Sequence, residues 1–302
     1  MARASTAKPL QGVRILSLAL NLPGPAALMR LRQLGATCTK LEPPPPDGAP
    51  SADPMVRYAP HAYTQLHEGI RVLHADLKTP AGQARLHRHL ARVDVLITSF
   101  RPAALNKLGL SWRELHRQHP QLCHVAIQGE TGPRAEIPGH DLTYLAEHGL
   151  IQGLNLPTSL YADMAGSLAA CEAALALLWQ RARPGPRQGQ GARREVGLSE
   201  SAHHLSLPWH WGLTQPDGII GGAHAGYRVY ACQDGRVAVA ALEPHFAQRL
   251  CDVAGLRVPH PDQHLMTPQA QQQLKRFFAR HTQQALRDLA QAHDLPLHTL
   301  DP

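Results

Sequence analysis

The feature that most constrains the fold is a repeated alternation of short β-rich runs with Ala- and Leu-rich helical segments. A run at Val13–Leu18 is followed by a Pro-Gly turn, a helical segment that ends at Leu34, and a second run at Thr37–Leu41. Further helices are predicted from Thr79 and after Asp163, and further strands at Val93–Thr98, Leu122–Ile127 and Arg194–Leu198. This pattern predicts an α/β domain over residues 1–200, with a Rossmann-like, mainly parallel sheet covered by helices on both faces.

A second, smaller domain is predicted at the C-terminal end. The turn residues Gln233-Asp234-Gly235 separate strand-like runs at Tyr227–Ala231 and Arg236–Leu242, which is typical of a β-hairpin. From Pro244 onward the pattern is helical. We therefore expect an α+β domain over residues 223–302, joined to the large domain by a linker at 201–222.

The proline-rich segment 43–54 interrupts the alternation of strands and helices. It begins with four consecutive prolines and contains two more, and proline cannot donate a backbone hydrogen bond to a regular element. We expect this segment to be an extended surface loop.

Charge and composition exclude several classes of protein. The net charge of +7 favours anionic partners, but the basic residues form no stripe interleaved with aromatic residues, so nucleic acid is not a predicted partner. The five cysteines form no CxxC pair and no HExxH motif occurs, so neither a disulfide framework nor a metal site is predicted.

The longest apolar run, Leu168–Trp179, contains Glu172 and is shorter than the ~20 residues of a membrane helix. These features favour a cytoplasmic protein without a membrane segment, and the lack of GxGxxG argues against NAD.

Three acid or base residues stand at element boundaries, where side chains can project into a cleft. His140 precedes the helical pattern Leu142–Leu150, and a helix N-terminus favours a neutral imidazole base. The alternative without a catalytic role is that His140 lies in an exposed N-cap turn, with Asp141 as the cap. Asp163 lies at the start of a long helix, as an N-cap or as a carboxylate kept ionised by helix amides. Glu243 ends the last strand-like run, either near a ligand or as a solvated charge.

Eight short stretches, in order along nearly the whole chain, resemble the family III CoA-transferases (CaiB/BaiF type), and within them the α-methylacyl-CoA racemase branch. They are PLQGVRIL at 9–16, PGP at 23–25, DLKTPAG at 76–82, DVLITSFRP at 94–102, LNKLGL at 105–110, GHDLTYL at 139–145, ADMAG at 162–166 and ALEPHF at 241–246.

The resemblance implies roles for the three boundary residues. In the racemase branch His140 and Asp163 would act as an acid and base pair across the α-carbon of a 2-methylacyl-CoA, and Glu243 would support His140. The thioester stabilises the intermediate as an enolate. In a CoA-transferase Asp163 would instead attack the thioester as a nucleophile and form a mixed anhydride.

The resemblance also implies coenzyme A contacts and a homodimer, in which the subunits interlock. Asn21, Leu22 and Pro23 would lie against the pantetheine, Phe100 and Arg101 would line the nucleotide end, and Lys78 and Lys107 would be near the phosphates.

A third reading is a shortened, non-catalytic CoA-binding relative. The arginine usual in the family after Glu42 is replaced by Pro43, and the sequence ends at Asp301-Pro302 without the family's C-terminal segment that returns to the large domain. Racemase, transferase and non-catalytic relative remain three alternatives at this point.

Overall fold

A computed structural model describes residues 8–46 and 48–301. The chain divides into two compact units, with the first ending at Ser206 and the second beginning at Leu207. Each unit has its own sheet and its own apolar core, and each is described by itself below.

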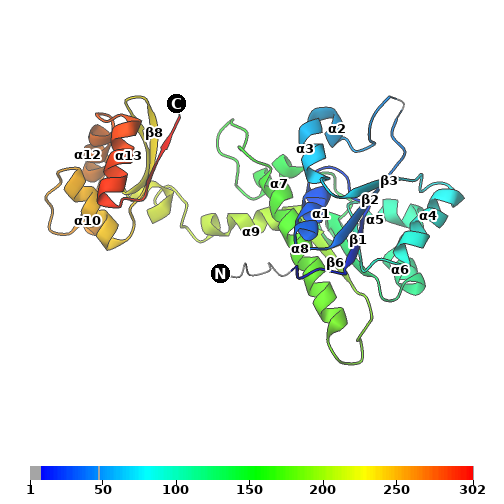
Figure 1. Ribbon diagram of the computed structural model, residues 1–302. Coiled ribbons are helices and arrows are strands. Elements are labelled where there is room, and N and C mark those ends of the chain that lie inside the picture. The colour runs from blue at the N-terminus through cyan, green and yellow to red at the C-terminus, as the bar shows by residue number, and fades with distance from the viewer. Residues whose placement is uncertain (1–7, 47, 302) are drawn as a thin grey trace, which may run out of the picture. The chain divides into compact units, whose positions relative to one another are not determined.

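The first unit is built around a six-stranded sheet in which every strand pair is parallel, as the alternation in the sequence predicts. The strand order is β3-β2-β1-β4-β5-β6 (Figure 1). The strands of this sheet are β1 (Arg14–Ser17), β2 (Thr37–Glu42), β3 (Arg71–His74), β4 (Val95–Thr98), β5 (Cys123–Gln128) and β6 (Arg193–Gly197). The order reverses between β1 and β4, and in open α/β sheets this switch point is where ligands bind.

Helices connect these strands, and many begin with proline at the first helical position, where a missing N–H costs no hydrogen bond. The helices of the first unit are α1 (Pro23–Gln33), α2 (Met55–Tyr58), α3 (Pro60–Leu66), α4 (Pro80–Leu90), α5 (Pro102–Lys107), α6 (Trp112–Gln118), the short η1 (Gly132–Arg134), α7 (Asp141–Glu147), α8 (Tyr161–Ala182) and α9 (Leu198–His210). Helix α9 runs across the boundary between the units and occupies part of the segment predicted as a linker.

Successive strand residues point to opposite faces of the sheet, so two separate cores form. Ile15 and Val125 belong to the core beneath α1 and α8, whereas Leu16 and Leu96 belong to the core beneath α4, α5 and α6. Figure 1 shows these two helical layers on either side of the sheet.

Helix α8 is 22 residues long and apolar enough to cross a membrane by length and composition. Its Ala170, Ala174 and Leu177 are buried in the core that also contains α1 and β5. Helix α8 therefore packs as a core helix of the first unit.

The second unit pairs a small antiparallel sheet, in the order β7-β8-β9, with a helical layer. Its elements are η2, a π-helical turn (Ile219–Ala223), β7 (Tyr227–Cys232), β8 (Gly235–Ala240), α10 (Pro244–Val253), α11 (Pro261–His264), α12 (Pro268–Phe278), α13 (Gln283–His293) and β9 (Leu297–Leu300). Phe278, Leu274 and Leu250 are buried in its core.

Three expectations from the sequence were wrong. Strand β3 was not predicted, and the region after Pro244 is not helical throughout, because β9 returns to pair with β8. The proline-rich segment 43–54 is not wholly on the surface, since Ser51 and Asp53 are buried. The physical reason is that Asp53 pairs with the buried Lys40 and that the Ser51 hydroxyl donates to Glu42.

Candidate active site

A cavity of about 650 Å³ lies in the first unit at the carboxyl ends of β1, β4 and β5, next to the switch point of the sheet. Its walls come from the loops after these strands and from the starts of α2, α7 and α8. The lining residues used below are Asn21, Pro23, Tyr58, Phe100, Arg101, Gln128, Gly129, Gly139, His140, Asp141, Tyr144 and Asp163.

His140 is exposed on the cavity wall and is the N-cap residue of α7, so the helix begins one residue later, at Asp141. The cap is secured by Thr143, whose hydroxyl accepts the His140 N–H at 3.0 Å and donates to the His140 carbonyl at 2.8 Å. Both bonds use the His140 backbone, and His140 lines the cavity. The alternative of an exposed N-cap turn holds in part, since His140 is exposed, but the cap is His140 itself and not Asp141.

Asp163 is half-buried on the same cavity, in the first turn of α8. Its backbone N–H donates to the carboxylate of the buried Asp141 at 3.0 Å. Because Asp141 directly follows His140, this bond ties the start of α7 to the start of α8. The hydrogen bond between Asp163 and Asp141 therefore keeps His140 and Asp163 on the same cavity.

Burial raises the pKa of the Asp163 carboxyl to about 7, and the negative charge of Asp141 adds to the increase. This direction is opposite to the one that helix amides alone would give, because burial disfavours the charged form. A carboxyl group with a pKa near neutrality is populated in both protonation states, which suits an acid or base.

Tyr144 packs beneath the loops that carry His140. It is buried, and burial raises the pKa of its hydroxyl to about 12. Gly129 and Gly139 lie so close to the Tyr144 ring that a side chain at either position would collide with it. Tyr144 thus sets the spacing between the loop after β5 and the start of α7.

Asn21 stands at the entrance to α1 in a left-handed conformation, with φ of 64°. Its N–H donates to the carboxylate of Asp53, with both distances at 3.2 Å. Asp53 also accepts from Lys40 at 2.6 Å, and Lys40 reaches Glu42 at 2.8 Å and His67 at 3.0 Å. A fully buried lysine on β2 therefore anchors the cavity wall through Asp53.

The predicted coenzyme A residues divide between two cavities and the core. Asn21, Pro23, Phe100 and Arg101 line the cavity with His140 and Asp163. Lys78 and Lys107 line a neighbouring cavity of about 650 Å³ next to α4 and α5. Leu22 is half-buried and packs in an apolar cluster with Ala26, Met55 and Leu66.

Glu243 belongs to the second unit, where it is exposed and precedes α10 as its N-cap residue. Its predicted support of His140 joins residues of the two units and stays a prediction.

Sequence reasoning missed four side chains of the cavity: Tyr58, Gln128, Asp141 and Tyr144. Asp141 and Tyr144 carried a signal, since both lie in the GHDLTYL stretch with His140. Tyr58 and Gln128 became visible only through the fold, because they come from separate elements that converge on the cavity.

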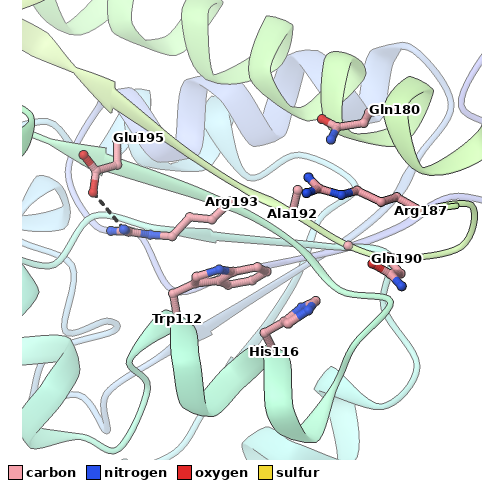
Figure 2. A pocket seen from close by; sticks show the side chains of 9 residues that line it. Trp112, His116, Gln180, Arg187, Gln190, Ala192, Arg193 and Glu195 are labelled. Carbon is pink, nitrogen blue, oxygen red and sulfur yellow. Dashed lines mark ion pairs between the residues drawn. The ribbon is translucent and has the colours of Figure 1, made fainter.

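A further cavity, of about 580 Å³, lies between α6, the end of α8 and β6 (Figure 2). It is lined by Trp112, His116, Gln180, Arg187, Gln190, Gly191, Ala192, Arg193 and Glu195. Its carboxylate, Glu195, is paired with Arg193 at 2.8 Å. The cavity with His140 and Asp163 is the better candidate for acid–base chemistry.

The comparison with protein families gives the class of protein. The family described as CoA-transferase family III matches residues 10–301. The chain therefore belongs to CoA-transferase family III, and the resemblance noted from the sequence is confirmed.

Curated relatives differ in their reactions. The chain is similar to alpha-methylacyl-CoA racemase from Homo sapiens, with 30% identity over 265 residues, which covers 82% of this chain and 65% of the racemase. It is also similar to succinyl-CoA–D-citramalate CoA-transferase from Chloroflexus aurantiacus, with 34% identity over 207 residues, covering 64% of this chain and 50% of that protein. The chain thus spans half to about two thirds of the length of these relatives.

A solved structure confirms the predicted α/β fold. The crystal structure of a hypothetical protein from Mycobacterium tuberculosis matches with a TM-score of 0.80 and 25% identity, covering 98% of this chain and 85% of that one.

Proposed function

We propose that this protein is an acyl-CoA-dependent enzyme that racemises or epimerises a 2-methylacyl-CoA through an enolate, with His140 and Asp163 as the acid and base. One residue removes the α-proton, the thioester carbonyl takes up the negative charge, and the other residue returns a proton to the opposite face.

The observation that carries this proposal is that His140 and Asp163 line one cavity while the pKa of Asp163 is raised to about 7. A two-base reaction needs one group protonated and the other unprotonated at the same pH. A carboxyl group with an ordinary pKa would be almost wholly ionised at neutral pH and would be a poor acid.

The residues around the two cavities fit a coenzyme A thioester. Arg101, Lys78 and Lys107 offer positive charge for phosphate groups. Lys78 and Arg101 follow the carboxyl ends of β3 and β4, and Lys107 is the last residue of α5. Pro23, Phe100 and Leu142 add apolar lining next to His140 and Asp163. A thioester makes the α-proton of its acyl chain more acidic, which is the chemistry the proposed pair requires.

The proposal extends to Glu243 and to assembly. In the racemase reading Glu243 supports His140, as the family resemblance implies. We propose a homodimer, as the family resemblance implies, and a cytoplasmic location, which the scattered cysteines favour.

The test uses an enantiopure 2-methylacyl-CoA and chiral analysis of the acyl group after incubation. The proposal predicts conversion of either enantiomer into the same mixture. The proposal fails if both enantiomers are recovered unchanged over several acyl chain lengths while the protein binds coenzyme A.

A CoA-transferase is the second candidate, and the similarity to the Chloroflexus transferase supports it. In this reaction the Asp163 carboxylate attacks the thioester, so it must be ionised, and the raised pKa of Asp163 weighs against it. The transferase reading predicts that hydroxylamine in the presence of acyl-CoA modifies Asp163. Peptide mass spectrometry that finds Asp163 unmodified would exclude it.

A further inference from the structure

The cavity in Figure 2 has no role in the proposed reaction, and it shares no lining residue with the cavity of His140 and Asp163. Gly191, Ala192 and Arg193 line it where β6 begins. The candidate active site lies instead at the carboxyl ends of β1, β4 and β5. The two cavities are therefore separate places in the first unit.

This cavity extends across the outer edge of the sheet. Strand β6 is the last in the order of the sheet, so within residues 8–46 and 48–301 only one of its edges pairs with a neighbouring strand. Helix α6 packs on one face of the sheet through Leu115, and α8 packs on the other face through Leu177. Trp112 and His116 come from α6 and Gln180 comes from α8. A molecule bound in the cavity would thus contact both helical layers.

One wall of the cavity is aromatic. The rings of Trp112 and His116 have their centroids 4.9 Å apart, and Figure 2 shows them side by side. Trp112 also stacks on the ring of His124, which is fully buried, with the centroids 6.1 Å apart. The indole is therefore held in place from inside the protein while it lines the cavity. Such a wall favours a ligand with a planar aromatic ring, because aromatic rings attract one another when they stack.

The charged side chains of the cavity leave one positive charge uncompensated. Glu195 is the one acid among the lining residues, and it is already paired with Arg193 at 2.8 Å. Across the described parts of the chain, the side chains of Arg187, Gln180 and Gln190 form no hydrogen bond or ion pair with another residue. Three side chains with N–H donors are thus available to a ligand, and the charge of Arg187 favours an anionic one.

We infer that this cavity is a second ligand site, which binds a small anion that carries an aromatic ring. The ring stacks on Trp112 and His116, and the anionic group pairs with Arg187. The amides of Gln180 and Gln190 donate hydrogen bonds to polar atoms of the same ligand. The cavity volume of about 580 Å³ lies within the range of roughly 300–1,000 Å³ that is usual for small-molecule sites. The inference does not depend on the proposed function, because the acid–base pair takes no part in it.

The test uses 1-naphthyl phosphate, which has both the ring and the anionic group, and isothermal titration calorimetry in the presence of excess coenzyme A. The wild type should bind it with a Kd below about 1 mM. 1-Naphthol lacks the phosphate and inorganic phosphate lacks the ring, so each should bind at least about tenfold more weakly. Absence of binding of 1-naphthyl phosphate would overturn the inference, as would an equal affinity for inorganic phosphate.

Arg187→Gln assigns the binding to this cavity. The side chain is exposed, so the variant should fold as the wild type does, and its Kd for 1-naphthyl phosphate should rise about tenfold. Arg183→Gln is the matched control, because Arg183 is exposed in the same loop but does not line the cavity. Its Kd should equal that of the wild type. An unchanged Kd in Arg187→Gln, or the same rise in both variants, would contradict the assignment.

Trp112→Leu tests the aromatic wall. It should raise the Kd for 1-naphthyl phosphate and leave the weak binding of inorganic phosphate unchanged, because only the ring loses its stacking partner. If the affinity for 1-naphthyl phosphate is the same as in the wild type, the ring does not bind at Trp112 and the inference fails.

A nucleotide and an aromatic acid share this chemistry, and two ligands distinguish them. Binding of adenosine 5′-monophosphate that is weakened in Arg187→Gln would assign the site to nucleotides, and such binding of benzoate would assign it to aromatic acids. Binding of neither would overturn the inference. Displacement of 1-naphthyl phosphate by coenzyme A would also overturn it, because the ligand would then occupy the cavity of His140 and Asp163. Failure of coenzyme A itself to bind would count against the proposed function alone.

Discussion

The carboxyl group of Asp163 lies partly buried beside the carboxylate of Asp141, and the pKa of Asp163 is raised to about 7. In the unfolded chain the pKa of an aspartate is about 3.9. Between these two values the folded protein binds a proton that the unfolded chain has released. The free energy of unfolding must therefore fall as pH rises through this range.

Asp163→Asn should stabilise the protein at high pH while removing its activity. The variant lacks the charge that is unfavourable in the cavity, so its free energy of unfolding should exceed that of the wild type by about 1–3 kcal/mol at pH 8, allowing for partial solvent screening. The difference should shrink towards zero near pH 4, where folded Asp163 is protonated. Urea denaturation at the two pH values measures it, and a difference independent of pH would contradict the assigned pKa.

Asp141→Asn should shift the pH dependence of the reaction. Asparagine retains an oxygen that can accept the Asp163 N–H but removes the negative charge, so the pKa of Asp163 should fall. The limb of the kcat/KM profile that reports Asp163 should move to lower pH in both reaction directions. If the variant is active and this limb of its kcat/KM profile lies at the same pH as in the wild type, the limb does not report the titration of Asp163.

At the scale of elements, the cavity wall depends on a charge cluster that spans β2, the segment 43–54 and α3. Lys40, Glu42 and Asp53 have fully buried side chains. The His67 ring donates from Nδ1 to the Tyr63 carbonyl at 2.6 Å, so its Nε2 is free to accept from Lys40. All three N–H groups of Lys40 are thus used, which makes a buried lysine tolerable.

Asp53→Ala should destabilise the protein by about 3–5 kcal/mol, because it leaves Lys40 buried with one carboxylate fewer and removes the anchor of Asn21. The matched control is Asp94→Ala. Asp94 also accepts a backbone N–H and pairs with Arg181, but it is partly exposed and lies at the other ends of the strands. Asp94→Ala should lower the free energy of unfolding by about 1 kcal/mol. If urea denaturation gives the same decrease in the free energy of unfolding for both variants, burial of the charge cluster adds nothing to stability.

The elements that were predictable from the sequence are those in which local periodicity and burial agree. Strands β1, β4 and β5 contain runs of buried apolar residues, and β2 was predicted because it follows the helix end at Gly35. Strand β3 has four residues, Arg71–His74, and only Leu73 among them is buried, so no run identifies it. Strand β9 pairs with β8 across more than fifty intervening residues, and that pairing has no local sequence signal.

The candidate site was predictable to a similar, limited extent. His140 and Asp163 were identified by a family resemblance, not by spacing, because either residue alone is an ordinary helix start. The role of Asp53 depends on a contact between separate elements. A loop rich in proline gives no sign that Asp53 pairs with a buried lysine on β2.

For the whole molecule, two separate cores predict two separable unfolding transitions. Phe278 is fully buried in the second unit and stacks on Tyr230 at 4.9 Å between ring centroids. Phe278→Ala should destabilise the second unit by about 3–5 kcal/mol and leave the transition of the first unit in place. Leu28→Ala, in the core of the first unit, is the converse control. Calorimetry that shows both transitions shifted equally by each variant would contradict two independent cores.

Glu243 connects the proposed chemistry to the whole molecule, because it belongs to a different unit from His140. If it orients the His140 ring, Glu243→Gln should lower kcat about tenfold to a hundredfold while coenzyme A binding remains. Unchanged kcat in this variant would remove Glu243 from the catalytic group without affecting the roles proposed for His140 and Asp163.

The central claim is that His140 and Asp163 exchange the α-proton of an acyl-CoA from opposite faces, and deuterium exchange tests it most directly. In deuterium oxide the wild type should replace the α-proton of both enantiomers of a 2-methylacyl-CoA, as followed by mass spectrometry. His140→Gln and Asp163→Asn should each lose interconversion, and each should exchange only the enantiomer that faces its remaining base. Retention of the α-proton by the wild type with both enantiomers would contradict the claim.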